Sequence, residues 1–472
     1  MNPVRAVAYA RRHRPRFVAE LKEFVRFPSV SNQPQRVPDL RRCASWLASH
    51  LRNIGLESVQ IVPTKRHPIV YASWRHAHGK PTILIYGHYD VQPAEPLSLW
   101  RNPPFEPVIK NDNLYGRGAS DDKGQMFTHV KALESYMKTE RSLPVNVKCV
   151  FEGEEELGGG KNLESFVRRN RSALQADAAV MSDTFMLGPG KPAIGHALRG
   201  DLRFEIEVRG PRHDLHSGNF GGVVHNPLQA LCEILTSLHH SDGRVAIQNF
   251  YDKVRNWNTQ EREYMQKIGP RDPDILRDAG VALEWGESGY SLYERIGTRP
   301  SLSLNGIRGG YQGPGLKTII PAKATAKFSI RIVPDQTAAE IERLLREHIA
   351  RVSPPDISVK VKTLAESNPA LVNRNHPAMQ AAAHAYRKGF GTWPVFIRSG
   401  GSIPAASIFQ KTLGIPTVLM GFALPDDNLH APNEKFHLPN FYRGIETAIW
   451  YLALAARLRN SRRSPSKQRQ TV

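Results

Sequence analysis

The stretch VNVKCVFEGEEELGGG, residues 145–160, joins a short apolar run to four glutamates and three glycines. Its first half is rich in β-branched and aromatic side chains, which favour a strand. The second half gathers negative charge at one point of a chain whose formal net charge is +20. We therefore expect a strand that ends in a cluster of carboxylates.

Three further runs have the same character and are separated by stretches long enough for helices: TILIY at 82–86, AAVMS at 178–182 and TVLMG at 417–421. This alternation predicts an α/β fold with a mostly parallel sheet flanked by helices. Between residues 40 and 54 apolar side chains recur at helical spacing, and Gly55 is placed to end that helix. The basic first residues predict a helix that runs into VAELKEFVRF.

The middle of the chain has a different pattern. DLRFEIEVRG and AKATAKFSIRIVP alternate strictly between polar and apolar residues, which predicts strands with one wet face. Helical patterns follow both, so we expect a second, α+β domain inserted into the first. The predicted boundaries are 1–198 and 366–458 for the catalytic domain, 199–365 for the inserted lid and dimerisation domain, and 459–472 for a basic disordered tail. An irregular elaboration at 253–300 has no predicted role.

The composition limits the class of protein. The longest apolar runs fall far short of the ~20 residues that span a bilayer, and the start lacks a signal-peptide pattern. We therefore expect a cytoplasmic protein without membrane contact.

The chain has three cysteines, Cys43, Cys149 and Cys232. They are too scattered for a disulfide framework, and their apolar neighbours predict buried, reduced thiols.

The positive excess, 64 Lys and Arg against 44 Asp and Glu, raises nucleic-acid binding as a second class of function. The densest basic cluster is the tail RLRNSRRSPSKQRQTV, which is typical of a solvated end. Elsewhere the basic residues are spread out, without aromatic residues interleaved among them. An enzyme is the preferred hypothesis, and a basic nucleic-acid-binding protein remains a remote alternative.

Polar residues follow the predicted strands: His88, Asp183 and the glutamate cluster lie directly after them, and His430 comes after the last one. Ligands of open α/β sheets bind beyond the carboxyl ends of the strands, so these side chains should converge on one crevice. Each motif alone is a weak signal and is more often a solvated loop or turn. Together they supply imidazole and carboxylate ligands for two divalent ions, with zinc expected and manganese or cobalt as alternatives.

Eight motifs occur in an order that resembles the M20 metallopeptidase family, in particular its carnosinase and cytosolic non-specific dipeptidase branch. They are GHYDVQP, GRGASDDKGQ, EGEEELGG, SDTFMLG, DLHSGNFGG, FSIRIVP, RSGGSIP and LHAPNEKF. The resemblance covers nearly the whole chain. It implies that His88 and Asp183 hold one metal ion, that Glu156 and His430 hold the other, and that Asp121 bridges the two.

The resemblance also implies the catalytic groups. Glu155 would be the general base, Asp90 would orient His88, and the peptide bond after Asp121 would be cis. His216 would reach the active site of a partner subunit and stabilise the oxyanion there, which implies a homodimer.

The substrate-binding residues are implied in the same way. Arg331 would clamp a substrate carboxylate, although on an alternating strand it could equally be a solvated arginine. Gly400, Gly401 and Ser402 would bind the substrate backbone, and Ser399 stands where many relatives have glutamate. The implied activity is hydrolysis of dipeptides with a free C-terminal carboxylate. An N-acyl amino acid amidase of the same family is the alternative.

Overall fold

The computed structural model describes residues 1–158 and 160–458. These residues form two compact units. The first comprises residues 1–196, 372–396 and those from Ile408 onward, and the second comprises residues 197–371 and 397–407. The segment 397–407, which the predicted boundaries assign to the catalytic domain, packs with the second unit. The predicted disordered tail, 459–472, lies outside the described residues.

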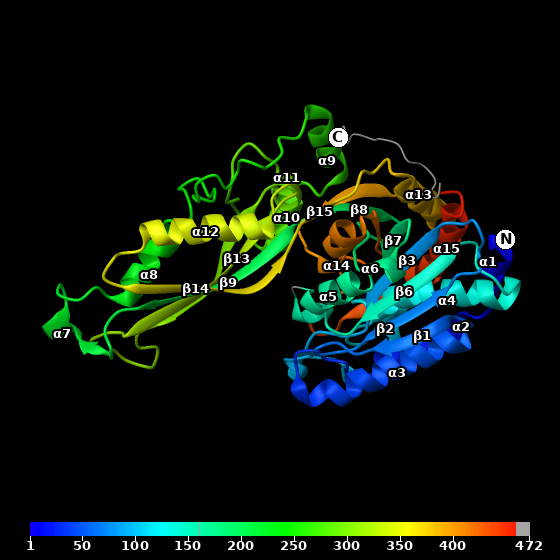
Figure 1. Ribbon diagram of the computed structural model, residues 1–472, viewed down its shortest axis with the longest axis horizontal. Helices are drawn as coiled ribbons and strands as arrows, with labels where there is room; N and C mark the ends of the chain where they lie inside the picture. Colours follow the sequence, from blue (N-terminus) through cyan, green and yellow to red (C-terminus); the bar gives the residue numbers. More distant parts are fainter. Residues whose placement is uncertain (159, 459–472) are drawn as a thin grey trace. The chain divides into compact units, whose positions relative to one another are not determined.

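A nine-stranded sheet forms the core of the fold (Figure 1). Its strands run in the order β1 (Glu57–Val62), β2 (Ile69–Trp74), β6 (Asn146–Glu152), β3 (Thr82–His88), β7 (Ala178–Met181), β17 (Thr417–Met420), β8 (Ala193–Leu198) and β15 (Ala370–Leu371), and β16 (Val395–Ser399) pairs with β8. The four strands β6, β3, β7 and β17 are mutually parallel, whereas the outer pairs are antiparallel. This sheet, with its four parallel central strands, confirms the predicted α/β class.

The connections around β3 decide where a ligand can bind. The chain leaves β3, forms β6 on one side of it, and then returns to form β7 on the other side. Such a reversal of direction opens a crevice at the carboxyl ends of the strands. Four adjacent parallel strands therefore end at the same edge of the sheet.

Helices cover the sheet because its parallel strands are buried on both faces. One face shares a hydrophobic core with α1 (Pro3–Arg12), α2 (Arg14–Val25), α3 (Val37–Asn53), α4 (Lys123–Glu140), α13 (Pro377–Phe390) and α15 (Leu438–Ala455). On the other face the Tyr86 ring lies 5.6 Å from that of Phe409 in η4 (Phe409–Leu413). Helices α5 (Lys161–Arg169) and α6 (Arg171–Leu174) pack against η4.

The helix predicted at 40–54 is α3, which buries Leu40, Cys43, Leu47 and Leu51, and Ile54 directly after it is buried as well. Gly55 follows it with φ +97°, a conformation that suits glycine at the end of a helix. Cys43 and Cys149 are buried free thiols, as expected. The prediction for Cys232 is wrong: it is exposed, because α8 (Pro227–Thr236) turns Leu231 and Leu235 inward instead.

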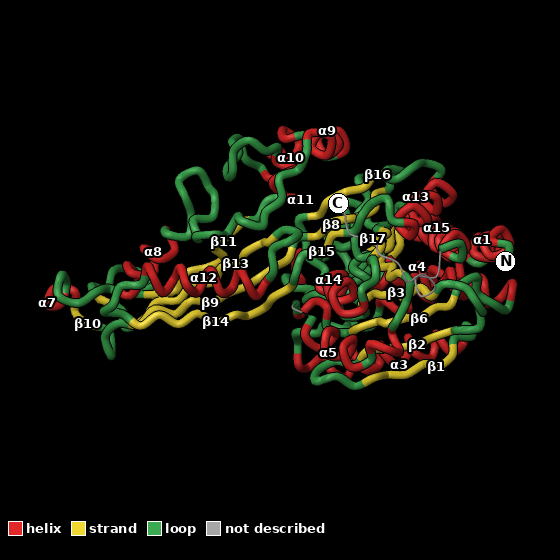
Figure 2. The backbone as a smooth tube through the Cα atoms, turned by 45° about the horizontal axis from the view of Figure 1, so that its top comes forward, coloured by secondary structure: helices red, strands yellow, loops and turns green. Residues whose placement is uncertain are grey.

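The second unit is built on a four-stranded antiparallel sheet in the order β11 (Ser301–Gly309), β13 (Lys323–Ile332), β9 (Gly200–Arg209) and β14 (Ser358–Ser367) (Figure 2). Alternate residues of β9 and β13 are buried against α8 and α12 (Ala338–Val352), which confirms the alternation seen in the sequence. The elaboration at 253–300 contains α9 (Thr259–Ile268), α10 (Asp272–Ala279) and α11 (Leu292–Thr298). The remaining elements of this unit are β10 (Leu215–His216), which pairs with β12 (Ile319–Ile320), and α7 (Ser217–Phe220), while α14 (Pro404–Ile408) precedes η4.

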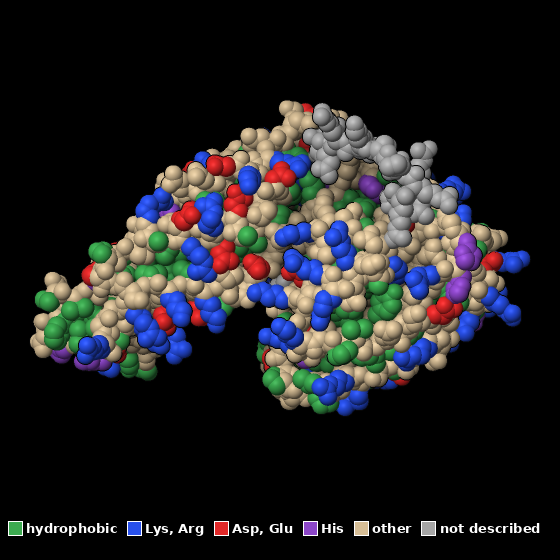
Figure 3. All heavy atoms as spheres, viewed as in Figure 1, with side chains coloured by type: hydrophobic (Ala, Val, Ile, Leu, Met, Phe, Trp, Pro, Cys, Tyr) green, Lys and Arg blue, Asp and Glu red, His purple; other side chains and the backbone are tan. Residues whose placement is uncertain are grey.

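Basic side chains are spread over the face of the molecule that Figure 3 draws. Figure 3 shows Lys and Arg across the face drawn, with Asp and Glu interspersed among them. On β9, for example, Glu207 accepts a hydrogen bond of 2.7 Å from Arg209. Within the described residues, the helices lack the length and apolar character that crossing a bilayer requires.

Candidate metal centre

Four adjacent strand ends and one loop supply the predicted metal ligands. His88 is the last residue of β3, Glu156 follows β6, Asp183 follows β7, and His430 follows β17. Asp121 lies in the loop that leads into α4. The structure thus brings all five side chains together within the first unit.

The five ligands form two groups that share Asp121. His88, Asp121 and Asp183 make one group, and Asp121, Glu156 and His430 make the other, with ligand atoms within 4.8 Å of one another in each. Asp121 Oδ1 lies 3.1 Å from His88 Nε2, whereas its Oδ2 lies 2.8 Å from His430 Nε2. One carboxylate therefore faces both groups, which is the geometry of a bridging ligand.

The donor atoms fit two divalent ions. His88 Nε2 and Glu156 Oε1 are both buried and make no hydrogen bond of good geometry within the described part of the chain. His88 Nε2 lies 3.9 Å from Asp183 Oδ2, and Glu156 Oε1 lies 3.5 Å from His430 Nε2. A buried polar atom without a partner is costly, and a cation between these atoms would give each of them one. Imidazole nitrogen and carboxylate oxygen are ligands that zinc, manganese and cobalt accept.

Charge repulsion within the centre leads to the same conclusion. Burial raises the pKa of Asp183 to about 7, and the negative charge of Asp121 adds to the effect. Burial also raises the pKa of Glu156, again with a contribution from Asp121, and it raises that of Glu155 well above its ordinary range. The site thus concentrates more negative charge than its two histidines offset. Divalent cations would balance this charge.

Asp90 links the first group to the glutamate cluster. Its carboxylate oxygens accept hydrogen bonds from the backbone N–H groups of Glu155, at 3.2 Å, and Glu156, at 3.1 Å. These residues begin the 3₁₀ turn η3 (Glu155–Leu157), which separates the directions of two adjacent side chains. The turn is followed by Gly158 with φ +72°.

Asp90 also contacts His88. His88 Nδ1 lies 3.1 Å from the backbone oxygen of Asp90, so with Nδ1 as donor the lone pair of His88 Nε2 faces Asp121.

Several residues around the ligands were not assigned from the sequence. Gln92, within the GHYDVQP motif, donates a hydrogen bond of 2.7 Å to Glu156 Oε2. Asp122 accepts one of 3.2 Å from the backbone N–H of His88, and the Asp121–Asp122 peptide bond is cis, as the resemblance implies. Glu152 is the last residue of β6. It is buried beneath Tyr86, whose hydroxyl donates to it, and burial raises its pKa to about 8.

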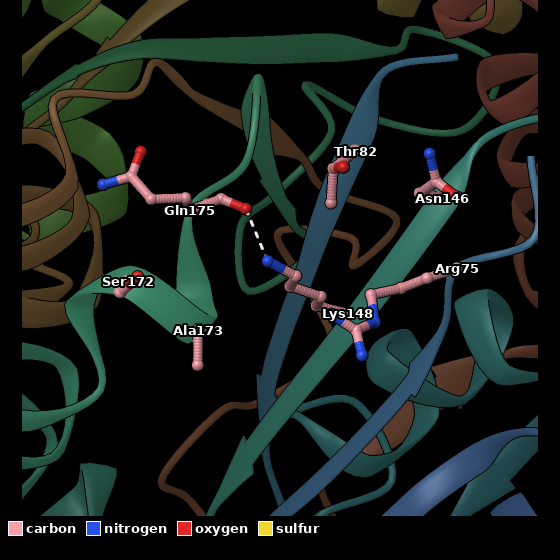
Figure 4. A pocket seen from close by; sticks show the side chains of 7 residues that line it. All are labelled: Arg75, Thr82, Asn146, Lys148, Ser172, Ala173 and Gln175. Carbon is pink, nitrogen blue, oxygen red and sulfur yellow. Dashed lines mark hydrogen bonds between the residues drawn. The ribbon is translucent and has the colours of Figure 1, made fainter. Parts of the chain in front are cut away.

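Two other features of the first unit do not belong to this centre. A hollow lies where β3 and β6 begin, at the opposite ends of these strands from the metal ligands (Figure 4). It is lined by Arg75, Thr82, Asn146, Lys148, Ser172, Ala173 and Gln175. In addition, Glu20, His50 and Glu134 form a third cluster of potential ligands. Lys131 Nζ lies 2.7 Å from His50 Nε2 and 2.8 Å from Glu134 Oε2, so an ammonium group already neutralises that cluster.

The predicted substrate-binding residues lie in the second unit. Arg331 on β13 donates a hydrogen bond of 2.8 Å from Nη1 to Ser402 Oγ, and its side chain is 31% exposed. Arg199 Nε donates to the backbone oxygen of Gly400 at 3.1 Å. The structure therefore places Arg331 beside the RSGGSIP loop rather than free in solvent.

Two further predicted positions have simple local roles in this unit. Ser399 Oγ accepts a hydrogen bond of 3.1 Å from the backbone N–H of Gly401, so it helps to shape the loop. His216, at the end of β10, is exposed, and its Nδ1 accepts a hydrogen bond of 3.0 Å from the backbone N–H of Gly218. Nε2 of His216 takes no part in this hydrogen bond.

Known proteins similar to this chain show its family. The model of Peptidase family M20/M25/M40 matches residues 84–453. The chain belongs to this family. This confirms the resemblance seen in the motifs, and it makes the protein an enzyme of the peptidase class.

Relatives of this peptidase match it over nearly its whole length. Cys-Gly metallodipeptidase DUG1 of Candida albicans is 32% identical over 93% of the chain and 94% of its own length. Human Beta-Ala-His dipeptidase is 33% identical over 94% of the chain and 91% of its own length. Among solved structures, an M20 family metallo-carboxypeptidase from Sulfolobus solfataricus superposes with a TM-score of 0.84 at 33% identity, covering 94% of this chain and 99% of that one. Human carnosine dipeptidase 1 superposes with a TM-score of 0.82 at 31% identity, covering 97% of this chain and 99% of that one.

Proposed function

We propose that this M20 peptidase is a di-metal dipeptidase that hydrolyses dipeptides with a free C-terminal carboxylate. The observation that carries the proposal is the position of Asp121, whose two oxygens face two separate groups of ligands. The names of its relatives, Cys-Gly metallodipeptidase and Beta-Ala-His dipeptidase, support the substrate class. Zinc is the proposed metal, with manganese or cobalt as alternatives.

Glu155 is the proposed general base. Two divalent ions held by His88, Asp121, Asp183, Glu156 and His430 would polarise the scissile carbonyl and acidify a water molecule. Glu155 then accepts the proton of the attacking water and delivers it to the departing amine. Asp90 fixes the turn that carries Glu155 and, through its backbone oxygen, the tautomer of His88.

The second unit supplies the proposed substrate contacts. Arg331 binds the C-terminal carboxylate, a role that suits a planar guanidinium group. Ser402, already hydrogen-bonded to Arg331, would contact the same end of the substrate, with Gly400 and Gly401 offering backbone groups beside it. His216 would act in the active site of a partner subunit, which makes the protein a homodimer. The three free cysteines fit the reducing conditions of the cytoplasm, where we place the protein.

A substrate panel with matched pairs tests this proposal. Cys-Gly and β-Ala-His would each be assayed beside the same dipeptide with an amidated C-terminus, together with N-acyl amino acids. The proposal predicts hydrolysis of the free dipeptides and much slower hydrolysis of their amides. Turnover confined to N-acyl amino acids would instead identify the alternative amidase, and equal turnover of acid and amide would refute the carboxylate requirement.

A further inference from the structure

A buried carboxylate outside the ligand set, Glu434, joins the two segments that carry Asp121 and His430. In the first unit β18 (Lys435–His437) pairs with β5 (Asn113–Tyr115), which pairs in turn with β4 (Val108–Lys110). Glu434 directly precedes β18, and its backbone oxygen accepts a hydrogen bond of 2.9 Å from the N–H of Gly116. This pairing brings Glu434 alongside the loop that ends at Asp121.

The Glu434 side chain accepts four hydrogen bonds in this position. Oε1 accepts from the backbone N–H groups of Ser120, at 2.9 Å, and Asp121, at 3.0 Å. Oε2 accepts from the backbone N–H of Gly118 and from Arg117 Nη1, both at 2.8 Å. A carboxylate can accept about four bonds, so this one is fully used, and its fully buried oxygens fix three backbone groups of one loop.

Arg117 extends the link to the other ligand. Its side chain is 1% exposed, and Nη2 donates to the backbone oxygens of Pro93, at 3.1 Å, and Ala431, at 3.2 Å. Ala431 follows His430, which has φ +60°, a conformation that a residue other than glycine rarely keeps without support. The buried Arg117–Glu434 pair is therefore hydrogen-bonded to the backbone of both ligand segments, at Asp121 in one and at Ala431 in the other.

A second buried carboxylate, Asp427, also links the segment that ends at Asp121 to the segment that carries His430. Asp427, which is fully buried, accepts hydrogen bonds of 3.0 Å from Ser120 Oγ and 2.7 Å from Lys435 Nζ. It also accepts one of 2.8 Å from the backbone N–H of Leu424. The loop before Asp121 is thus attached at two places to the segment that carries His430.

We propose that Glu434, supported by Arg117, is a positioning residue that sets the separation between Asp121 and His430 and thereby controls the affinity of both metal sites. The inference rests on the proposed di-metal function. Both sites should respond together because Asp121 faces both groups. Partners that orient metal ligands from behind typically contribute about 10- to 100-fold in metal affinity.

Two variants test this role. Glu434→Gln keeps the shape of the side chain but turns one acceptor into a donor that faces backbone N–H groups. Glu434→Asp keeps the charge beside Arg117 but withdraws the carboxylate by one methylene. The metal-free proteins would be titrated with Zn²⁺ or Co²⁺ against a chromophoric chelator, after circular dichroism has confirmed that they are folded. We expect both variants to bind both ions about 10- to 100-fold more weakly.

Glu446→Gln is the matched control. Glu446 is a buried carboxylate on α15 that accepts hydrogen bonds from Arg11, at 2.8 Å, and Arg14, at 3.2 Å. None of the hydrogen bonds described for it reaches a metal ligand. The control should lower the melting temperature of the metal-free protein while leaving both metal affinities at the wild-type level.

The possible outcomes separate the inference from the proposed function. Wild-type affinity for both ions in folded Glu434 variants would overturn the positioning role. Failure of both variants to fold, while Glu446→Gln folds, would overturn it as well, because Glu434 would then be a general stabilising residue. Binding of fewer than two ions by the wild-type protein would contradict the proposed di-metal function instead.

Discussion

Oδ2 of Asp121 lies 2.8 Å from Nε2 of His430, although the two residues are 309 positions apart in the chain. The other oxygen of the same carboxylate faces His88. Loss of Asp121 would therefore remove a ligand from both groups at once, whereas loss of any other ligand would affect one group directly. The chemistry proposed for this peptidase depends on that shared position.

Glu155→Gln should remove hydrolysis without removing metal. A general base contributes about 10²- to 10⁴-fold, so kcat should fall by at least a hundredfold while the metal content stays at the wild-type value. Steady-state kinetics and elemental analysis of the same preparation measure both quantities. Glu154→Gln is the matched control, because Glu154 accepts its hydrogen bonds from Asn162 and the backbone of His67. Survival of activity in Glu155→Gln would rule out the proposed base.

Arg331→Ala should reduce the preference for a free carboxylate. A hydrogen bond to a charged group is worth about 1.5–3 kcal/mol, so kcat/KM for dipeptides should fall about 10- to 100-fold. Amidated dipeptides lack the negative charge, so their kcat/KM should change much less. The ratio of kcat/KM for a free dipeptide to that for its amide should therefore fall. Arg203→Ala on the neighbouring strand, where the side chain is 51% exposed, provides the control. An unchanged ratio in Arg331→Ala would place the carboxylate site elsewhere.

His216 can be tested by complementation between subunits. His216→Ala and Glu155→Gln should each be nearly inactive alone. A mixed dimer would contain one complete site, formed by Glu155 of one subunit and His216 of the other. After subunit exchange in an equal mixture, about a quarter of the wild-type activity should return. Formation of mixed dimers, detected by native mass spectrometry, without any recovery of activity would contradict the action of His216 across the interface.

The stability of the protein should depend on pH through His129. Burial lowers its pKa to about 4, whereas the unfolded chain titrates near 6.5. Between these values the unfolded chain binds more protons, so the free energy of unfolding falls as the pH drops through this window. Urea denaturation at pH 7 and pH 5 should show a loss that is about 2 kcal/mol smaller in His129→Gln than in the wild type. His78 is exposed, and His78→Gln should lose as much free energy of unfolding between pH 7 and pH 5 as the wild type. An equal loss in the wild type, His129→Gln and His78→Gln would refute the role of His129.

The sequence predicts the sheet and the edge where the ligands gather. Apolar runs such as TILIY have few alternatives to a buried strand, and polar residues that follow such runs must lie at strand ends. The same stretch combines a strand, a carboxylate cluster and glycines, which predicts acids at a strand end, whereas the separate roles of Glu155 and Glu156 come from the resemblance to the M20 family. Local patterns are sufficient for the sheet and for the place of the acidic cluster.

The rest depends on contacts that no local pattern reveals. Arg117 and Glu434 are separated by 317 residues, and neither stands out among the many charged residues of a basic chain. Glu152 belongs to the visible acidic cluster, but its burial follows from β6 extending as far as that residue. Cys232 was misassigned because a shift of one position on a helix decides between core and solvent.

The most direct test of the account is the metal content of Asp121→Ala beside that of Asp183→Ala. Both proteins would be purified without chelator, checked for folding, and analysed by elemental mass spectrometry against the wild type. We predict two ions per subunit in the wild type, one in Asp183→Ala and close to none in Asp121→Ala, because Asp121 faces both groups whereas Asp183 belongs to one. Retention of two ions by Asp121→Ala would contradict the bridging role on which the proposed chemistry rests.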